Sequence, residues 1–132
     1  MKQSDKSGLL SPSPGVVTTP AQGTLAIPAI PHATTNERLI VGKIVDDVLA
    51  AGAVITVNDG EEDTLSLSSD REAIFAALSS TDEDYLFVTQ VTGKVSWVRL
   101  VWGNDCDVIS DYQIRLEALL AGANALAEEL DR

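Results

Sequence analysis

The strongest pattern of hydrophobic and polar positions lies between Tyr85 and Trp102. This stretch reads YLFVTQVTGKVSWVRLVW, two runs rich in Val, Thr and aromatic residues on either side of Thr92-Gly93. Such runs around a short turn predict a β-hairpin. The stretch holds both tryptophans of a chain that is poor in aromatic residues. We therefore expect the hairpin to form the centre of a sheet on which the other elements pack.

The pairing of the hairpin decides which side chains share a face. If Thr92-Gly93 is a two-residue turn, Leu86 pairs with Arg99 and Val88 pairs with Trp97. One face then carries an apolar set suited to packing against helices: Tyr85, Phe87, Val98, Leu100 and Trp102. The other face carries a second apolar set around a single cation: Leu86, Val88, Val95, Trp97, Arg99 and Val101.

This second face is the candidate interface. A sheet with one helical layer would leave it exposed, and soluble monomers seldom tolerate a large exposed apolar patch. One expectation is that a helix or the N-terminal leader crosses to cover it. The other is that Trp97 and Arg99, with Leu86, Val88 and Val101 around them, anchor a homodimer or a protein partner, because Trp and Arg dominate binding hot spots.

The first helix is predicted after residue 33. Thr34-Thr35-Asn36-Glu37 has the spacing of a capping box, in which the Thr hydroxyl and the Glu carboxylate bond to backbone amides reciprocally. Ile40, Ile44 and Val48 then recur every four residues and indicate a buried stripe. Gly52 supplies the C-terminal stop.

Two further helices follow the same reasoning. Ser69-Asp70-Arg71-Glu72 has the spacing of a second capping box and opens a short helix. A stripe of Leu and Ala between Leu116 and Leu130 predicts the last helix, which Gly122 weakens by roughly 1 kcal/mol relative to Ala. The width of this stripe implies that packing stabilises the last helix.

The remaining strands complete the fold prediction. Residues 54–57 and 64–68 are strand-like around the turn Asn58-Asp59-Gly60, and residues 107–114 suggest a further strand. The order of elements is α-β-β-α-β-β-β-α with short connections. Short turns between consecutive strands imply antiparallel pairing. We therefore predict an α+β fold with an antiparallel sheet of about four to five strands packed with three helices.

The first 33 residues differ in composition from the rest. They hold all five prolines among Ser, Thr, Gly and Ala and show no hydrophobic period, so we predict a disordered leader, with residues 34–132 as a single domain. The apolar segment from Leu25 to Ile30 could dock on the domain or on a partner. His32, the only histidine, falls in this leader, which argues against a fixed general base.

The charge balance selects among partners. Nine Lys plus Arg stand against twenty Asp plus Glu, a formal net charge of −11. This charge disfavours direct binding to nucleic acid or to anionic membranes and attracts a basic protein. Seven carboxylates in two runs are the candidate recognition residues: Asp59, Glu61, Glu62, Asp63, Asp82, Glu83 and Asp84. The first run lacks the spacing of a calcium loop, so we predict no metal site. The alternative to a recognition role is that these carboxylates are solvated charges that keep the chain soluble.

Several activities are disfavoured by the sequence. No phosphate-binding, dinucleotide-binding, hydrolase or zinc-protease motif is present. Cys106 stands between Asp105 and Asp107, which would raise the pKa of its thiol. We therefore predict no catalytic residues and no cofactor. The longest apolar run, residues 48–57, is far shorter than the ~20 residues of a membrane span, and no signal peptide is visible, so we expect a cytoplasmic protein without a membrane partner.

Three function classes remain open. The leading hypothesis is a small, non-enzymatic binding or regulatory protein that acts through a protein surface, a build that suits an accessory protein of a phage or plasmid. One alternative is an acidic inhibitor whose carboxylates imitate DNA phosphates and occupy a nucleic-acid-binding protein. The other is a carboxylate-dependent, metal-assisted enzyme, which requires acids converging in one pocket.

Overall fold

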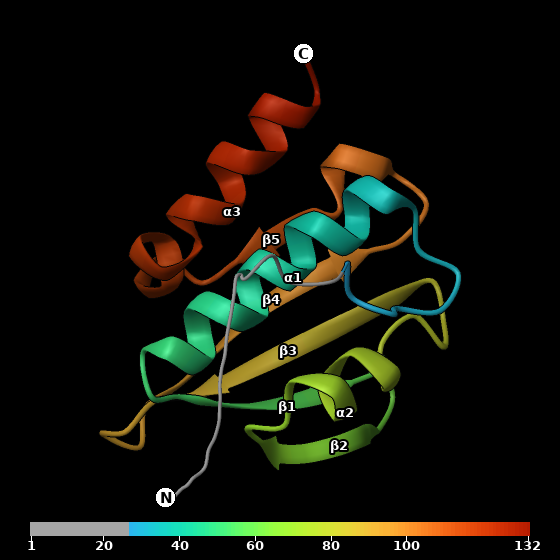
Figure 1. Ribbon diagram of the computed structural model, residues 1–132. Coiled ribbons are helices and arrows are strands. Elements are labelled where there is room, and N and C mark those ends of the chain that lie inside the picture. Colours follow the sequence, from blue (N-terminus) through green and yellow to red (C-terminus); the bar gives the residue numbers. More distant parts are fainter. Residues whose placement is uncertain (1–26) are drawn as a thin grey trace, which may run out of the picture.

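The computed structural model describes residues 27–132, which form a five-stranded antiparallel sheet and three α-helices (Figure 1). The strands are β1 (Val54–Asn58), β2 (Asp63–Ser68), β3 (Glu83–Thr89), β4 (Val95–Val101) and β5 (Ile109–Tyr112). The helices are α1 (Thr35–Ala50), α2 (Arg71–Ala76) and α3 (Glu117–Leu130), with 3-10 turns η2 (Asp105–Asp107) and η3 (Ile114–Leu116). The predicted α+β class and the predicted order of elements are confirmed.

The strand order in the sheet is β2-β1-β3-β4-β5, so the β3–β4 hairpin supplies the central strand. Helix α1 lies across one face of the sheet, with α3 and α2 beside it (Figure 1). The core lies between α1 and the strands. It includes wholly buried side chains from the three inner strands: Ile55, Val57, Leu86, Val88, Val98 and Leu100. The stripe predicted on α1 faces them, since Ile40, Ile44 and Val48 are also wholly buried.

The turn of the central hairpin has three residues rather than two. The Gln90 amide donates to the Lys94 carbonyl at 2.9 Å, and the Gly93 amide donates to the Gln90 carbonyl at 2.8 Å. Gly93 adopts a φ of +93°, as expected for a three-residue turn that closes with one left-handed residue. A two-residue turn of the common type would require a positive φ at Thr92 as well, which a β-branched residue resists.

This one-residue difference shifts the hairpin register, so the predicted faces are wrong. Tyr85 pairs with Arg99 and Phe87 pairs with Trp97. Because side chains alternate along a strand, Leu86 and Val88 belong to the buried face and do not share a face with Trp97. The face away from α1 instead carries Tyr85, Phe87, Trp97, Arg99 and Val101.

Helix ends follow the predicted capping chemistry with one correction. In α1, the Thr34 hydroxyl accepts from the Glu37 amide at 3.1 Å and the Glu37 carboxylate accepts from the Thr34 amide at 2.9 Å. The predicted capping box is therefore confirmed. In α2 the cap is Asp70 rather than Ser69: its carboxylate accepts from the amides of the second and third following residues at 3.1 and 3.2 Å. Asp caps a helix as well as Ser does.

Residues 27–33, which the sequence analysis assigned to the leader, lie against the domain. Ile30 is only 3% exposed and belongs to the core. Pro28 packs on Gly42 of α1, where an added β-carbon would approach the proline Cγ to 2.6 Å. The Ser79 hydroxyl donates to the Pro31 carbonyl. The rest of the predicted leader, residues 1–26, lies outside the described residues.

None of the helices between residues 27 and 132 has both the length and the apolar content needed to cross a membrane.

Candidate functional site

The face of the sheet opposite α1, here called the outer face, carries three aromatic side chains on the two central strands. Tyr85 and Phe87 are two residues apart on β3, so their side chains lie on the same face, and Trp97 on β4 pairs with Phe87. The rings of Tyr85 and Phe87 stack with centroids 6.2 Å apart, and Tyr85 meets Trp97 edge-on at 6.0 Å. All three are partly exposed. Stacked and edge-on contacts of this kind are energetically favourable, so the three rings form one aromatic surface on the outer face.

No helix among residues 27–132 covers this surface, because α1, α2 and α3 all pack into the core on the other side of the sheet. Val95 extends the apolar surface toward the hairpin turn and is 51% exposed. Thr56 of β1 borders the surface on its other side and is mostly buried. The sheet therefore has one face that forms the core and one face that is aromatic and accessible.

Arg99, predicted as the single cation of this face, is paired with a carboxylate. Its Nε donates to Glu83 Oε1 at 2.7 Å, and its terminal nitrogen donates to the Ser110 hydroxyl at 3.1 Å. The hydrogen bond that Arg99 donates to Glu83, together with the negative charge of Glu83, raises the pKa of Arg99. Exposed pairs of this kind stabilise a fold little. Because Arg99 is paired with Glu83, it does not offer a free positive charge to an acidic partner.

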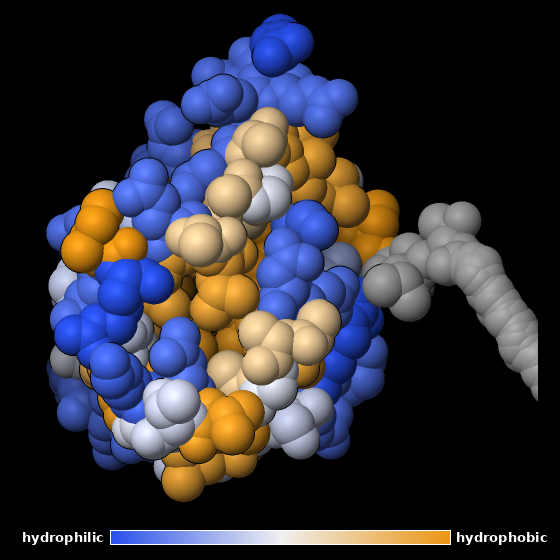
Figure 2. Space-filling model, turned by 90° about the vertical axis from the view of Figure 1, so that its left-hand side faces the viewer, coloured by the Kyte–Doolittle hydropathy of each residue, from blue (hydrophilic) through white to orange (hydrophobic). Residues whose placement is uncertain are grey.

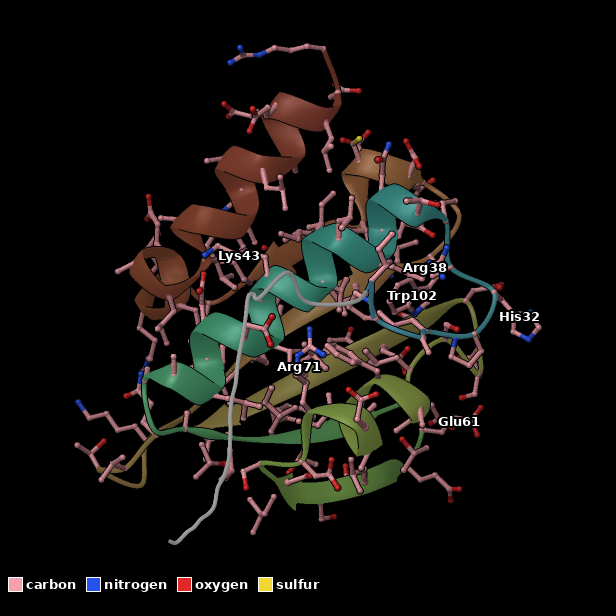
Figure 3. The ribbon with its side chains drawn as sticks, in the orientation of Figure 1. His32, Arg38, Lys43, Glu61, Arg71 and Trp102 are labelled. Atoms are coloured by element: carbon pink, nitrogen blue, oxygen red, sulfur yellow. The ribbon has the colours of Figure 1, made fainter. Side chains whose placement is uncertain are left out.

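The two acidic runs, far apart in the sequence, meet at one end of the sheet. The Thr81 hydroxyl donates to the Asp59 carbonyl at 3.1 Å, and a β-carbon at Gly60 would lie 3.9 Å from Cγ of Glu83. The β1–β2 loop therefore sits beside the start of β3. We call this surface the acidic end, and Glu61 marks it in Figure 3. It comprises six of the seven predicted recognition residues: Asp59, Glu61, Glu62, Asp63, Asp82 and Glu83.

The carboxylate of Asp59 organises the loop of the acidic end. It accepts hydrogen bonds from the amides of Glu61 and Glu62, both at 2.9 Å. These backbone donors lower the pKa of Asp59, because they stabilise its charged form. The loop is therefore held in a defined conformation with Asp59 ionised at neutral pH.

Asp84, the seventh predicted recognition residue, is wholly buried and does not belong to the surface. It lies on the core side of β3, where one carboxylate oxygen accepts from the Ser79 amide and from the Trp102 indole, both at 2.7 Å. The other oxygen is buried without a hydrogen-bond partner. Burial raises the pKa of Asp84, against the effect of these two donors.

The interface prediction is also corrected at two positions. Trp97, Arg99 and Val101 lie on the outer face as candidates, whereas Leu86 and Val88 are wholly buried in the core. Two aromatic residues that the sequence analysis placed against the helices, Tyr85 and Phe87, take their place. The signal that would have found them is the single glycine at position 93, which suits a three-residue turn.

Between residues 27 and 132, no three His, Cys, Asp or Glu side chains are grouped so that they could hold a metal ion. His32 is exposed and projects from the segment before α1 (Figure 3). Burial and the Asp105 carboxylate raise the pKa of the Cys106 thiol, as predicted, so it is not activated as a nucleophile. A hollow of about 410 Å³ lies beside Cys106 between α3 and β5, and three carboxylates line it: Asp107, Glu128 and Asp131.

Glu37 makes contacts that its capping-box spacing does not reveal. Its side chain is wholly buried. One carboxylate oxygen accepts from three consecutive amides, those of Gly103, Asn104 and Asp105, at 2.7, 3.1 and 3.1 Å. The Asp105 carboxylate in turn accepts from the Thr34 hydroxyl at 2.8 Å. Glu37 therefore fastens the turn after β4 to the start of α1 and serves the structure of the domain.

The described residues thus present an aromatic surface on the outer face, with the acidic end beyond Glu83. Family relationships add nothing to this picture. A comparison of the chain with protein-family models, with curated proteins and with solved structures finds no match.

Proposed function

We propose that this protein is a non-enzymatic binding or regulatory protein that holds another protein on the outer face of its sheet. The observation that carries the proposal is the aromatic surface of Tyr85, Phe87 and Trp97, which no helix among residues 27–132 covers. Aromatic side chains fixed on central strands lose little conformational entropy on binding, and Trp and Tyr are enriched in binding hot spots.

The meeting of the two acidic runs favours a second candidate, an acidic inhibitor that occupies a nucleic-acid-binding protein in place of DNA. In that case the acidic end would make the main contacts, and added duplex DNA would displace the protein from its partner. In the leading proposal the aromatic surface makes the main contacts, and DNA has no effect. The metal-assisted enzyme receives no support from the described residues.

The test is affinity capture from cells of the source with three baits. Wild type and Trp97→Ala are compared, and Ile27→Ala is the matched control, because Ile27 is an exposed apolar residue that lies beside α1 on the opposite side of the sheet. Proteins held by wild type and by the control, but lost with Trp97→Ala, are then purified. We expect their affinity for Trp97→Ala to fall at least about 30-fold, since a hot-spot residue contributes roughly 2 kcal/mol or more.

Circular dichroism must show that Trp97→Ala stays folded. If it does not, Val95→Lys replaces it, because Val95 is half exposed and lies outside the core. A folded variant that captures the same proteins with unchanged affinity would refute binding at the outer face.

A further inference from the structure

The outer face is polarised along its strands. From the hairpin turn toward the other end of β3 and β4, the paired positions are Thr89 with Val95, Phe87 with Trp97, Tyr85 with Arg99, and Glu83 with Val101. Val95 and the aromatic rings of Phe87 and Trp97 thus lie toward the turn, and the Arg99–Glu83 ion pair lies toward the other end, where Val101 pairs with Glu83. In Figure 1 the hairpin turn lies at the left and the β1–β2 loop, which carries the acidic end, lies at the right. The two ends of this face therefore differ in chemistry.

The end at the hairpin turn carries exposed apolar residues beside one exposed lysine, Lys94. Val91 in the turn is 82% exposed, Val95 at the start of β4 is 51% exposed, and Ile114, just after β5, is 77% exposed. Figure 2 shows the molecule from the end at which the hairpin turn lies, with hydrophobic residues between hydrophilic ones and the outer face seen edge-on. Val95 lies on the outer face with the aromatic rings, whereas Cγ2 of Val91 would lie 3.3 Å from a β-carbon at Gly52, at the end of α1. Exposed apolar surface such as that around Val95 is typical of a contact surface.

The opposite end carries negative charge that lacks cationic partners. Of the six carboxylates of the acidic end, only Glu83 takes part in a salt bridge within the described residues. Asp59 and Asp63 accept hydrogen bonds from neutral donors only: two backbone amides and the Asn58 side chain. Five exposed or partly exposed carboxylates therefore stand next to an apolar surface without a counter-charge.

We infer that the outer face takes a basic, amphipathic segment of a partner protein, and this inference rests on the proposed function. Apolar side chains of the segment pack on Val95, Phe87 and Trp97, and its Lys or Arg residues lie at the acidic end beyond Glu83. Complementary charge then fixes the direction in which the segment lies along β3 and β4.

Charge disfavours the alternative occupants. A second copy of the chain would bring a further formal charge of −11 against the first, and like charges oppose association. An acidic segment or a nucleic acid would meet the acidic end, while the one cation of the face, Arg99, is already paired. A basic segment is the occupant that meets both ends of the face favourably.

The experiment uses the full chain and synthetic peptides of about ten residues, which span the strands at ~3.3 Å per residue. The first peptide has Lys at one end and Leu at the other. In the second, Glu replaces Lys, and in the third, Ser replaces Leu. Binding is measured by NMR titration of the backbone and indole signals, which report on Gly60 at the acidic end and on Trp97 at the apolar end.

We expect only the Lys–Leu peptide to shift the signals of both ends. Its affinity should fall several-fold when salt rises from about 50 to about 500 mM, because screening shortens the range of charge interactions. The double variant Glu61→Gln/Glu62→Gln should bind it about ten-fold more weakly. The matched control Glu128→Gln/Glu129→Gln, exposed carboxylates on α3, should bind it as wild type does.

Three results would refute the inference that a basic segment binds. They are unchanged affinity in Glu61→Gln/Glu62→Gln, equal binding of the Glu–Leu peptide, and no binding of any peptide. Binding of the Glu–Leu peptide that Trp97→Ala abolishes would overturn this inference but leave the proposed function standing. Sedimentation as a dimer that Trp97→Ala dissociates would identify a second copy as the occupant. Signals of the outer face that shift when residues 1–26 are deleted would identify that segment as the occupant. Either result would overturn a basic partner.

Discussion

The substitution Glu37→Gln tests whether a single buried carboxylate fastens the turn after β4 to helix α1. In the wild type, one oxygen of Glu37 accepts from the amides of Gly103, Asn104 and Asp105, and the other accepts from the Thr34 amide. Four donors thus converge on two acceptor oxygens of a wholly buried side chain. Gln has nearly the same shape but only one acceptor oxygen.

The size of the effect follows from this count. If the Gln oxygen faces the three consecutive amides, its NH₂ group faces the Thr34 amide, and that donor loses its partner. Losing one hydrogen bond to a charged group costs about 1.5–3 kcal/mol, and the remaining bonds weaken because their acceptor is neutral. We therefore expect Glu37→Gln to lower the free energy of unfolding by about 2–4 kcal/mol. For a domain of this size that corresponds to a fall in Tm of roughly 10–25 °C.

The assay is urea unfolding followed by circular dichroism, with the thermal midpoint as a second readout. The matched control is Glu117→Gln, the same substitution at an exposed residue in the first turn of α3. The control should cost less than about 1 kcal/mol, because only the interaction with the helix dipole is lost. If Glu37→Gln unfolds with the same free energy as Glu117→Gln, the carboxylate does not hold the turn and the reasoning is refuted.

Two further predictions concern the core. Burial raises the pKa of Asp84, so the folded state favours its protonated form. The contribution of Asp84 to stability is therefore largest at low pH and falls as the pH rises from about 4 through the raised value. In urea unfolding from pH 4 to 7, Asp84→Asn should therefore lose this decrease in stability with pH and become more stable relative to wild type toward pH 7. The exposed control Asp82→Asn should not. An unchanged pH profile in Asp84→Asn would contradict the raised pKa of Asp84. In thermal unfolding, Gly42→Ala should destabilise by about 1–3 kcal/mol, because the new methyl group overlaps the ring of Pro28. Gly122→Ala should be neutral or slightly stabilising, because its helix propensity improves by about 1 kcal/mol and its new neighbours are the ends of two partly exposed side chains, Lys43 and Asp47, which can shift. Equal effects of the two substitutions would show that the Pro28 contact is not formed.

Local signals in the sequence are sufficient for the order of elements. The capping box at Thr34 and the left-handed Gly52 define α1 as predicted. The alternation of the β3 and β4 residues gives the hairpin. These features depend on residues within a few positions of each other, so a reading of the sequence captures them.

The faces of the hairpin were not predictable from alternation alone. Two-residue and three-residue turns give the same strands, but they exchange which residues of β3 share a face with which residues of β4. The preference of Thr92 against a positive φ, with Gly93 alone in the left-handed region, distinguishes the two turns. With that signal weighed, Tyr85 and Phe87 belong to the outer face.

Contacts between distant segments lay beyond the sequence signals. Asp84 belongs to an acidic run, yet it is buried because Trp102 and Ser79 supply donors from elsewhere in the chain. Ile30 stands in a segment rich in Pro and Ala, yet it completes the core beside α1. No spacing in the sequence marks the contacts of Asp84 or of Ile30, because these contacts form only when the sheet and helices have assembled.

The central claim is that a protein partner binds the outer face, and the two tryptophans of the chain allow one direct measurement. Trp97 lies on the outer face, whereas the Trp102 indole is bound to the buried Asp84 and serves as an internal control. The NMR signals of both indole N–H groups are followed while the captured partner is added to the full chain. If the partner binds the outer face, the Trp97 signal shifts in proportion to the bound fraction while the Trp102 signal stays in place. A bound complex in which the Trp97 signal does not move would contradict it.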